Sequence, residues 1–134
     1  LVSNEGVVSS NPKKEKLKSK KLIEQLFAEG KSVSNYPIKL VYLRTLNVDG
    51  SKIKTDVTAS KRNFKSAVKR NRIKSLMREL YRLKKPLIYN HIICDYAFMF
   101  LYLGKDMPKY DHLETCFKLI IKKLLTKENH ENVD

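Results

Sequence analysis

Residues 61–85, KRNFKSAVKRNRIKSLMRELYRLKK, determine most of the charge and much of the fold of this chain. The stretch holds eleven Lys or Arg and one acid, Glu79, and so supplies ten of the formal net charges of +14. Its apolar residues recur at the helical period, which predicts a helix over 66–85 that ends at Pro86. One face of this helix should pack on a sheet while the other stays basic. The apolar positions are Ile73, Leu76, Met77, Leu80 and Tyr81.

Composition limits the classes of protein that this chain can be. Its 134 residues are 42% hydrophobic, which is enough for one domain with a buried core. The sequence pI of about 9.8 favours a nucleic acid or an anionic membrane as partner. The apolar run Tyr96–Leu103 is far too short to span a membrane, and no signal peptide opens the chain, so we expect a cytoplasmic location. Two cysteines and three scattered histidines suggest neither a disulfide framework nor a metal site.

Upstream of the basic stretch, the pattern predicts one helix and a pair of strands. A short amphipathic helix is expected at 18–29, with Ser19 as N-cap and Gly30 as its C-terminal stop. Residues 38–43 and 52–59 have the composition of strands. Because Asp49-Gly50 is typical hairpin-turn chemistry, we expect these two strands to pair as an antiparallel hairpin.

Downstream, Tyr96–Leu103 is apolar throughout and predicts a central strand buried on both faces. A second amphipathic helix is expected at 111–125. The order is therefore helix, two or three strands, helix, strand, helix, which indicates an α+β fold. We expect residues 1–16 to be a flexible N-terminal tail, 17–128 a single domain, and 129–134 a polar tail.

The basic stretch also has the spacing of a phosphate-binding surface. Cations at 70, 74, 78 and 82 lie about 6 Å apart along a helix axis, and arginine binds phosphate through two parallel hydrogen bonds. Asn71, between two arginines, can pair with a base edge or a ribose hydroxyl. The alternative is a solvated basic face without a specific ligand. No phosphate loop, HExxH or GxSxG motif is present, so we expect no catalytic protein side chain.

The segment Lys65–Glu79, KSAVKRNRIKSLMRE, resembles the signature A-V-x-R-N-R-[IV]-K-R-x-[LIM]-R-E of the bacterial ribonuclease P protein subunit. Ile23–Gly30 is also similar to that family's F-x-x-V-F-x-x-G helix, with Ile and Leu replacing the first Phe and the Val. The resemblance covers about residues 17–125. It departs at Ser75, where the family has a second basic residue, and at 63–66, which replace a short glycine turn. The matching positions are Ala67, Val68, Arg70, Asn71, Arg72, Ile73, Lys74, Arg78 and Glu79.

The resemblance implies a fold and an activity. The fold would be αβββαβα, with a central mixed sheet packed by helices and a split βαβ unit with a left-handed crossover, as in the ribosomal protein S5 domain 2-like fold. The protein would assist ribonuclease P, an endoribonuclease that removes the 5′ leader of precursor tRNA. The catalytic RNA would perform the cleavage with Mg²⁺ that it binds itself, the protein holding no metal tightly. The protein would be a monomer within this ribonucleoprotein.

The resemblance also assigns residues to two sites. A cleft between the first helix and the sheet would hold the leader, lined by Phe27, Lys39 and Val41, although helical periodicity alone places Phe27 in the core. The competing hypothesis is a ribosomal or other structural RNA-binding protein without a role in tRNA processing; a DNA-binding helix fits less well. The residues expected to bind RNA are Lys61, Arg62, Lys69, Arg70, Asn71, Arg72, Lys74, Arg78 and Arg82.

Overall fold

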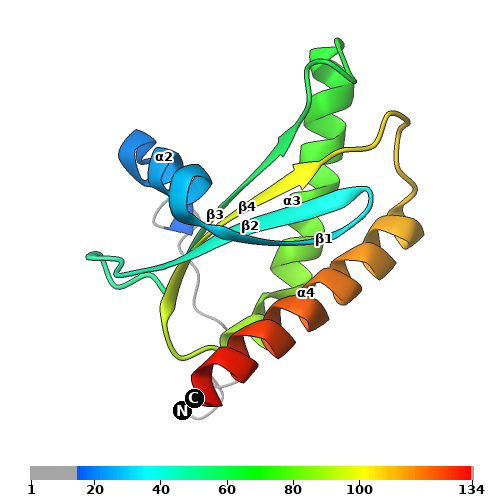
Figure 1. Ribbon diagram of the computed structural model, residues 1–134. Helices are drawn as coiled ribbons and strands as arrows, with labels where there is room; N and C mark the ends of the chain where they lie inside the picture. Colours follow the sequence, from blue (N-terminus) through cyan, green and yellow to red (C-terminus); the bar gives the residue numbers. More distant parts are fainter. Residues whose placement is uncertain (1–14, 134) are drawn as a thin grey trace, which may run out of the picture.

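The computed structural model describes the backbone of residues 15–133 and the side chains of residues 15–128. Within the described part of the chain, three helices and one four-stranded mixed sheet follow each other in the predicted order, so the α+β fold is confirmed (Figure 1). The expected tail at 1–16 lies almost wholly outside the described residues. No described helix is long and apolar enough to cross a membrane. The elements are α2 (Lys20–Glu29), β1 (Lys31–Asn35), β2 (Ile38–Thr45), β3 (Ile53–Ala59), α3 (Ala67–Tyr89), β4 (Asp95–Tyr102) and α4 (Tyr110–Val133).

The strands lie in the order β1-β2-β4-β3. The central position predicted for β4 is confirmed, because it pairs antiparallel with β2 and parallel with β3. The predicted hairpin between β2 and β3 is therefore wrong. Its turn does form, with Gly50 at φ 86°, but β4 lies between the two strands. Because β4 is apolar on both faces, an interior position in the sheet buries the most apolar surface. The hairpin in this fold is β1–β2, which turns at Tyr36-Pro37.

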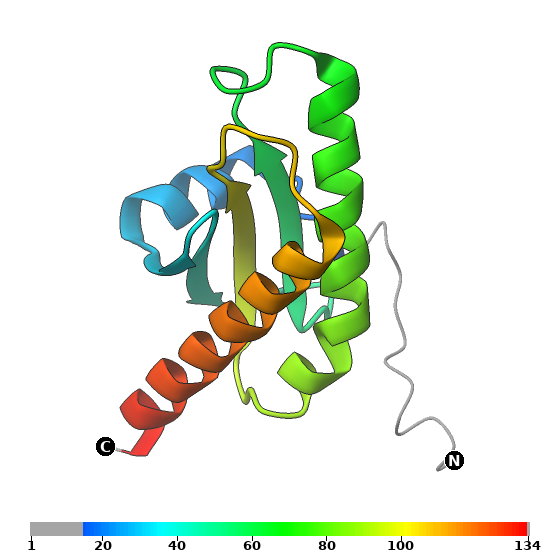
Figure 2. The same cartoon turned by 90° about the vertical axis from the view of Figure 1, so that its right-hand side faces the viewer.

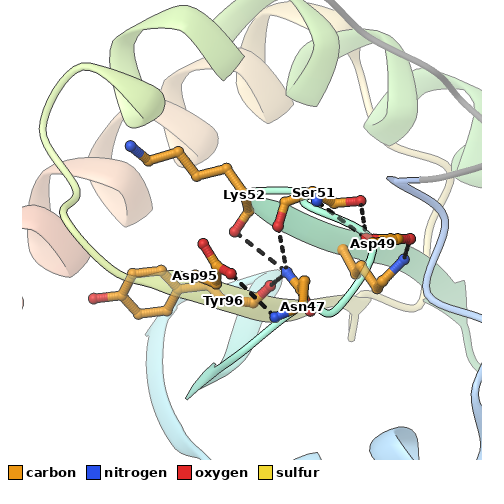
Figure 3. A network of polar contacts seen from close by, with 7 residues as sticks. Asn47, Asp49, Ser51, Lys52, Asp95 and Tyr96 are labelled. Carbon is orange, nitrogen blue, oxygen red and sulfur yellow. Dashed lines mark hydrogen bonds and ion pairs between the residues drawn. The ribbon is translucent and has the colours of Figure 1, made fainter.

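The loop between β2 and β3 is fastened to the start of β4, as Figure 3 shows. The Asn47 backbone N–H donates to Asp95 Oδ2 at 3.0 Å, and its side-chain amide donates to the carbonyl oxygens of Ser51 and Tyr96. Asp49 accepts hydrogen bonds from Ser51 and from Lys54 Nζ, the latter at 2.7 Å. These bonds satisfy the polar groups of a loop that must cross the end of β4 rather than close a hairpin.

The two faces of the sheet are covered differently. The helices α3 and α4 pack on one face and the short α2 packs on the other (Figure 2). The larger core lies under α3 and α4 and includes Phe98, Phe100 and Phe117, with the last two rings stacked at 4.8 Å between centroids. The smaller cluster lies under α2 and contains Leu17, Leu26, Val41, Ala97 and Met99. The alternation of side chains along β4 therefore supplies both cores.

The helix α2 begins and ends where its sequence predicts, but Gly30 ends it for a different reason from the usual left-handed glycine. Ser19 Oγ accepts from the Leu22 N–H at 3.2 Å, which confirms the N-cap. Gly30 follows α2 in an extended conformation, at φ −70°, and not in the left-handed one common at helix ends. A Cβ at Gly30 would lie 2.3 Å from the Leu26 carbonyl oxygen and 2.9 Å from that of Tyr42. Close approach of α2 to the sheet therefore requires the glycine.

Two helices run further than the sequence indicates. The sequence predicts that Pro86 ends α3, but the proline lies inside a helix that continues to Tyr89. Proline removes one backbone donor, and the burial of Lys85 and Ile88 on either side holds the last turn in place. Similarly, α4 continues to Val133, so residues 129–133 of the predicted polar tail are helical. The hand of the crossover through α3 stays a prediction.

Candidate nucleic-acid interface

The basic surface is built on α3 and on the loop that leads into it. Ser66 caps the helix, its Oγ accepting from the Lys69 N–H at 3.3 Å. The apolar face is buried as predicted, because Ile73, Met77 and Leu80 are fully covered by the sheet and α4. This packing fixes the helix, and it leaves the opposite side in solvent. The predicted RNA-binding residues that are exposed are Lys61, Arg62, Lys69, Asn71, Arg72, Arg78 and Arg82, while Arg70 and Lys74 are half-buried.

The exposed cations do not form a single stripe. Each helical residue turns by about 100°, so Arg72 and Arg78 point about 120° apart around α3. Lys69 lies on the side of Arg72, whereas Asn71 and Arg82 lie on the side of Arg78. The basic surface therefore wraps around the outer half of the helix, which suits a ligand that curves around it rather than a straight strand.

Arg70, the first member of the predicted stripe, is engaged within the protein. Its Nη1 donates to the carbonyl oxygens of Phe64 and Lys65, at 2.6 and 3.1 Å. Phe64 is buried against Tyr102, with ring centroids 6.0 Å apart. Arg70 thus secures the loop before α3, and part of its hydrogen-bonding capacity is already used. The sequence could not indicate this, because the acceptors are backbone carbonyls of a loop whose path depends on β4.

The same loop holds Lys61 and Arg62 in place. Ser60 Oγ accepts from the Arg62 N–H at 3.1 Å, and Asn63 Nδ2 donates to the carbonyl oxygens of Leu103 and Gly104, each at 3.2 Å. The turn is therefore fastened to the end of β4 and presents its cations beside the first turn of α3. A loop whose backbone is already fixed loses less conformational entropy on binding than a mobile loop would.

One acid lies within this surface. Glu79 forms a two-point ion pair with Arg82, in which Oε2 and Nη2 are 2.6 Å apart. The carboxylate raises the pKa of the Arg82 guanidinium. Arg82 is therefore oriented by its neighbour but has less net charge to offer a phosphate. Arg78, one turn earlier, is exposed on the same side of the helix.

The residues predicted for the leader cleft lie on the opposite side of the sheet. Phe27 is 51% exposed on α2, so periodicity was wrong to place it in the core. Lys39 is half-buried on the same face of the sheet, paired in register with Leu101. Val41 is only 8% exposed because it packs in the cluster under α2. The structure thus brings these residues to one face but makes only Phe27 and Lys39 accessible.

The sequence also missed a buried polar group at the far end of α4. Glu128 accepts from Arg44 Nε at 2.8 Å and from the hydroxyl of Tyr96. This ties the end of α4 to β2 and β4, and burial raises the pKa of the Tyr96 phenol. Because the sequence separations exceed thirty residues, no local pattern could reveal it. Within residues 15–128, no three His, Cys, Asp or Glu side chains gather as they would around a metal ion.

The fold and the surface together define a class: a small basic α+β domain that displays fixed cations on one helix, as a polyanion-binding protein does. Residues 12–125 match the ribonuclease P family. The chain is 34% identical over 106 residues to the ribonuclease P protein component of Porphyromonas gingivalis, covering 76% of this chain and 77% of that one. It is also 38% identical over 91 residues to the ribonuclease P protein component of Chlorobium phaeobacteroides, a match that covers 66% of this chain and 61% of that one. The chain belongs to the ribonuclease P protein family.

Solved structures agree on the fold. The ribonuclease P protein of Staphylococcus aureus superposes with a TM-score of 0.66 at 18% identity, covering 82% of this chain and 94% of that one. The ribonuclease P protein of Thermotoga maritima superposes with a TM-score of 0.63 at 17% identity, covering 81% of this chain and 96% of that one. The family is the protein component of an endoribonuclease ribonucleoprotein that processes tRNA. The resemblance carried by the Arg70-Asn71-Arg72 segment is thereby confirmed.

Proposed function

We propose that this protein binds the ribonuclease P RNA through the exposed cations of α3 and its leading loop. The observation that carries the proposal is the fixed basic surface, in which seven of the nine predicted RNA-binding residues are exposed on one rigid frame. Arg70 acts mainly by shaping the loop, through its bonds to the carbonyls of Phe64 and Lys65. The RNA performs the cleavage with Mg²⁺ that it holds itself. The protein acts in the cytoplasm as a monomer within the ribonucleoprotein.

We further propose that the 5′ leader of precursor tRNA lies along the opposite face of the sheet, beside α2. The support is an exposed aromatic ring, Phe27, and a cation, Lys39, on that face. Stacking and phosphate contacts of this kind tolerate different leader sequences. Val41 contributes by supporting α2 from below rather than by touching the leader.

Reconstitution with a bacterial ribonuclease P RNA tests the function. Adding the chain at low Mg²⁺ should restore removal of the leader, whereas the chain alone should cleave nothing. If the chain bound ribosomal RNA instead and left processing unchanged, the competing hypothesis of a structural RNA-binding protein would stand.

A charge-matched pair of variants tests the interface. Replacing Lys69, Arg72 and Arg78 by alanine should flatten the dependence of log affinity on log salt by about 0.7–0.9 for each phosphate that the variant no longer neutralises. The control replaces three exposed lysines of α4, Lys118, Lys122 and Lys127, and removes the same charge. Equal effects of the two triples on the slope would show that α3 is not the docking surface.

A further inference from the structure

A hollow of about 270 Å³ lies along the edge of the sheet, between β3, α3 and the chain just before α2. Val57, Tyr81 and Lys85 form its buried part, each less than a tenth exposed. Lys16, Arg78 and Arg82 also line it and are exposed. The deep part of the hollow is thus mostly apolar, with one buried ammonium that is paired with Glu15, and its opening to solvent is cationic. Of the residues that match the ribonuclease P signature, only Arg78 lines this hollow, and none of the leader-cleft residues does.

The walls of this hollow are fastened to one another. The Leu17 N–H donates to the Thr55 carbonyl oxygen at 3.0 Å, so Lys16 and Leu17 extend the edge of β3 as a short parallel bridge. The ammonium of Lys85, buried on α3, pairs with the Glu15 carboxylate. These contacts hold the segment before α2 at a fixed distance from α3. The hollow is therefore formed before any ligand arrives, which reduces the cost of binding.

The charges around the opening favour an anion. Of the two carboxylates that line the hollow, Glu15 is paired with Lys85, and Asp56 accepts from the Val57 N–H at 2.8 Å. Arg82 is oriented by Glu79, while Arg78 and Lys16 are exposed beside it. An aromatic floor below a cationic rim is the combination that binds an unstacked base together with its phosphate.

We propose that this hollow receives one unpaired nucleotide of the bound RNA. Its base enters between Val57 and Tyr81, and the phosphate beside it contacts Arg78 and Lys16. At about 270 Å³ the hollow is smaller than most drug-sized sites and suits a single base rather than a stack of two. The inference rests on the proposed RNA-binding function and adds a defined nucleotide site, next to Arg78 and away from Arg72, to the docking surface.

The test uses the full chain and mononucleotides, without the catalytic RNA. The probes are AMP, GMP, CMP and UMP, compared with ribose 5-phosphate, which has the phosphate but no base. By NMR, at least one nucleotide should bind several-fold more tightly than ribose 5-phosphate and shift the backbone amides of Thr55, Val57 and Arg82. If ribose 5-phosphate binds as tightly as every nucleotide, the hollow takes no base and the proposal is overturned.

Matched variants locate the site. Arg78→Ala should weaken nucleotide binding several-fold, whereas Arg72→Ala, which removes another exposed cation from a different side of α3, should leave it unchanged. An equal loss in both variants would mean a diffuse phosphate surface and would overturn the site. Because these measurements need no RNA subunit, they can fail while reconstituted processing succeeds, and they can succeed while it fails.

Discussion

Phe98 and Phe100 point from β4 into the core under α3 and α4, whereas Ala97 and Met99 point from the same strand toward α2. The first face is covered by two long helices and filled with aromatic rings, of which Phe98 and Phe100 meet edge-to-face and Phe100 and Phe117 are stacked. The second is covered by a ten-residue helix and a small aliphatic cluster. We infer that the first face supplies most of the stability and holds the RNA-docking helix, while the second is left partly open for a variable ligand.

The largest expected effect comes from the aromatic face. Phe100→Ala should lower the free energy of unfolding by about 3–5 kcal/mol, because it empties space beside Phe98 and Phe117 that rigid neighbours cannot fill. Met99→Ala, one residue earlier and on the other face, should cost about 2 kcal/mol. Urea denaturation measures both. Equal losses would contradict the inferred difference between the faces.

Adjacent residues of α2 provide a sharper comparison on the second face. Leu26 is fully buried, so Leu26→Ala should lower the free energy of unfolding by about 2–3 kcal/mol. Phe27→Ala should cost less than about 1 kcal/mol, since half of the ring is already in water. It should nevertheless weaken binding of precursor tRNA to the reconstituted ribonucleoprotein. A loss of stability at Phe27 as large as that at Leu26 would restore the core assignment.

The closeness of α2 to the sheet depends on Gly30. Gly30→Ala places a methyl group against two backbone oxygens that cannot move aside easily, and should cost about 1–3 kcal/mol. Hydrogen exchange should show that the loss is concentrated in α2. The neighbouring exposed Glu29→Ala serves as the control and should change stability little. Uniform loss of protection across the sheet would show that the two faces are not separable.

The smallest effect concerns the loop that routes the chain around β4. Hydrogen bonds from Lys54 and Ser51 lower the pKa of Asp49 below its ordinary value. Because the pKa of Asp49 is lower in the folded state than in the unfolded state, the ionised carboxylate stabilises the fold at pH values above the unfolded-state pKa, which is about 4. This stabilisation is lost as the pH falls below that pKa. Asp49→Asn should therefore be less stable than the parent at pH 7. If the difference in stability between the variant and the parent did not shrink as the pH was lowered below about 4, this prediction would be contradicted.

Much of the fold follows from local patterns. The period of Ile73, Met77 and Leu80 and the Ser19 cap placed two helices, and the apolar length of β4 placed it in the middle of the sheet. The errors at the turn, at Pro86 and at Phe27 involve long-range packing. Asp49-Gly50 forms its turn, but β4 separates the strands on either side. Pro86 stays helical because its neighbours are buried, and Phe27 is exposed because Leu26 takes the position facing the sheet.

The sequence by itself determined the element order, the basic helix and the family, because periodicity, charge density and the Arg70-Asn71-Arg72 signature are all local. Only the tertiary structure decided which cations reach solvent and which serve the protein. Arg70 bonds to the loop before α3, Lys85 pairs with Glu15, and Arg78 stands beside the hollow at the edge of β3. The physical reason is that a cation's role depends on what lies next to it, and those neighbours come from distant parts of the chain.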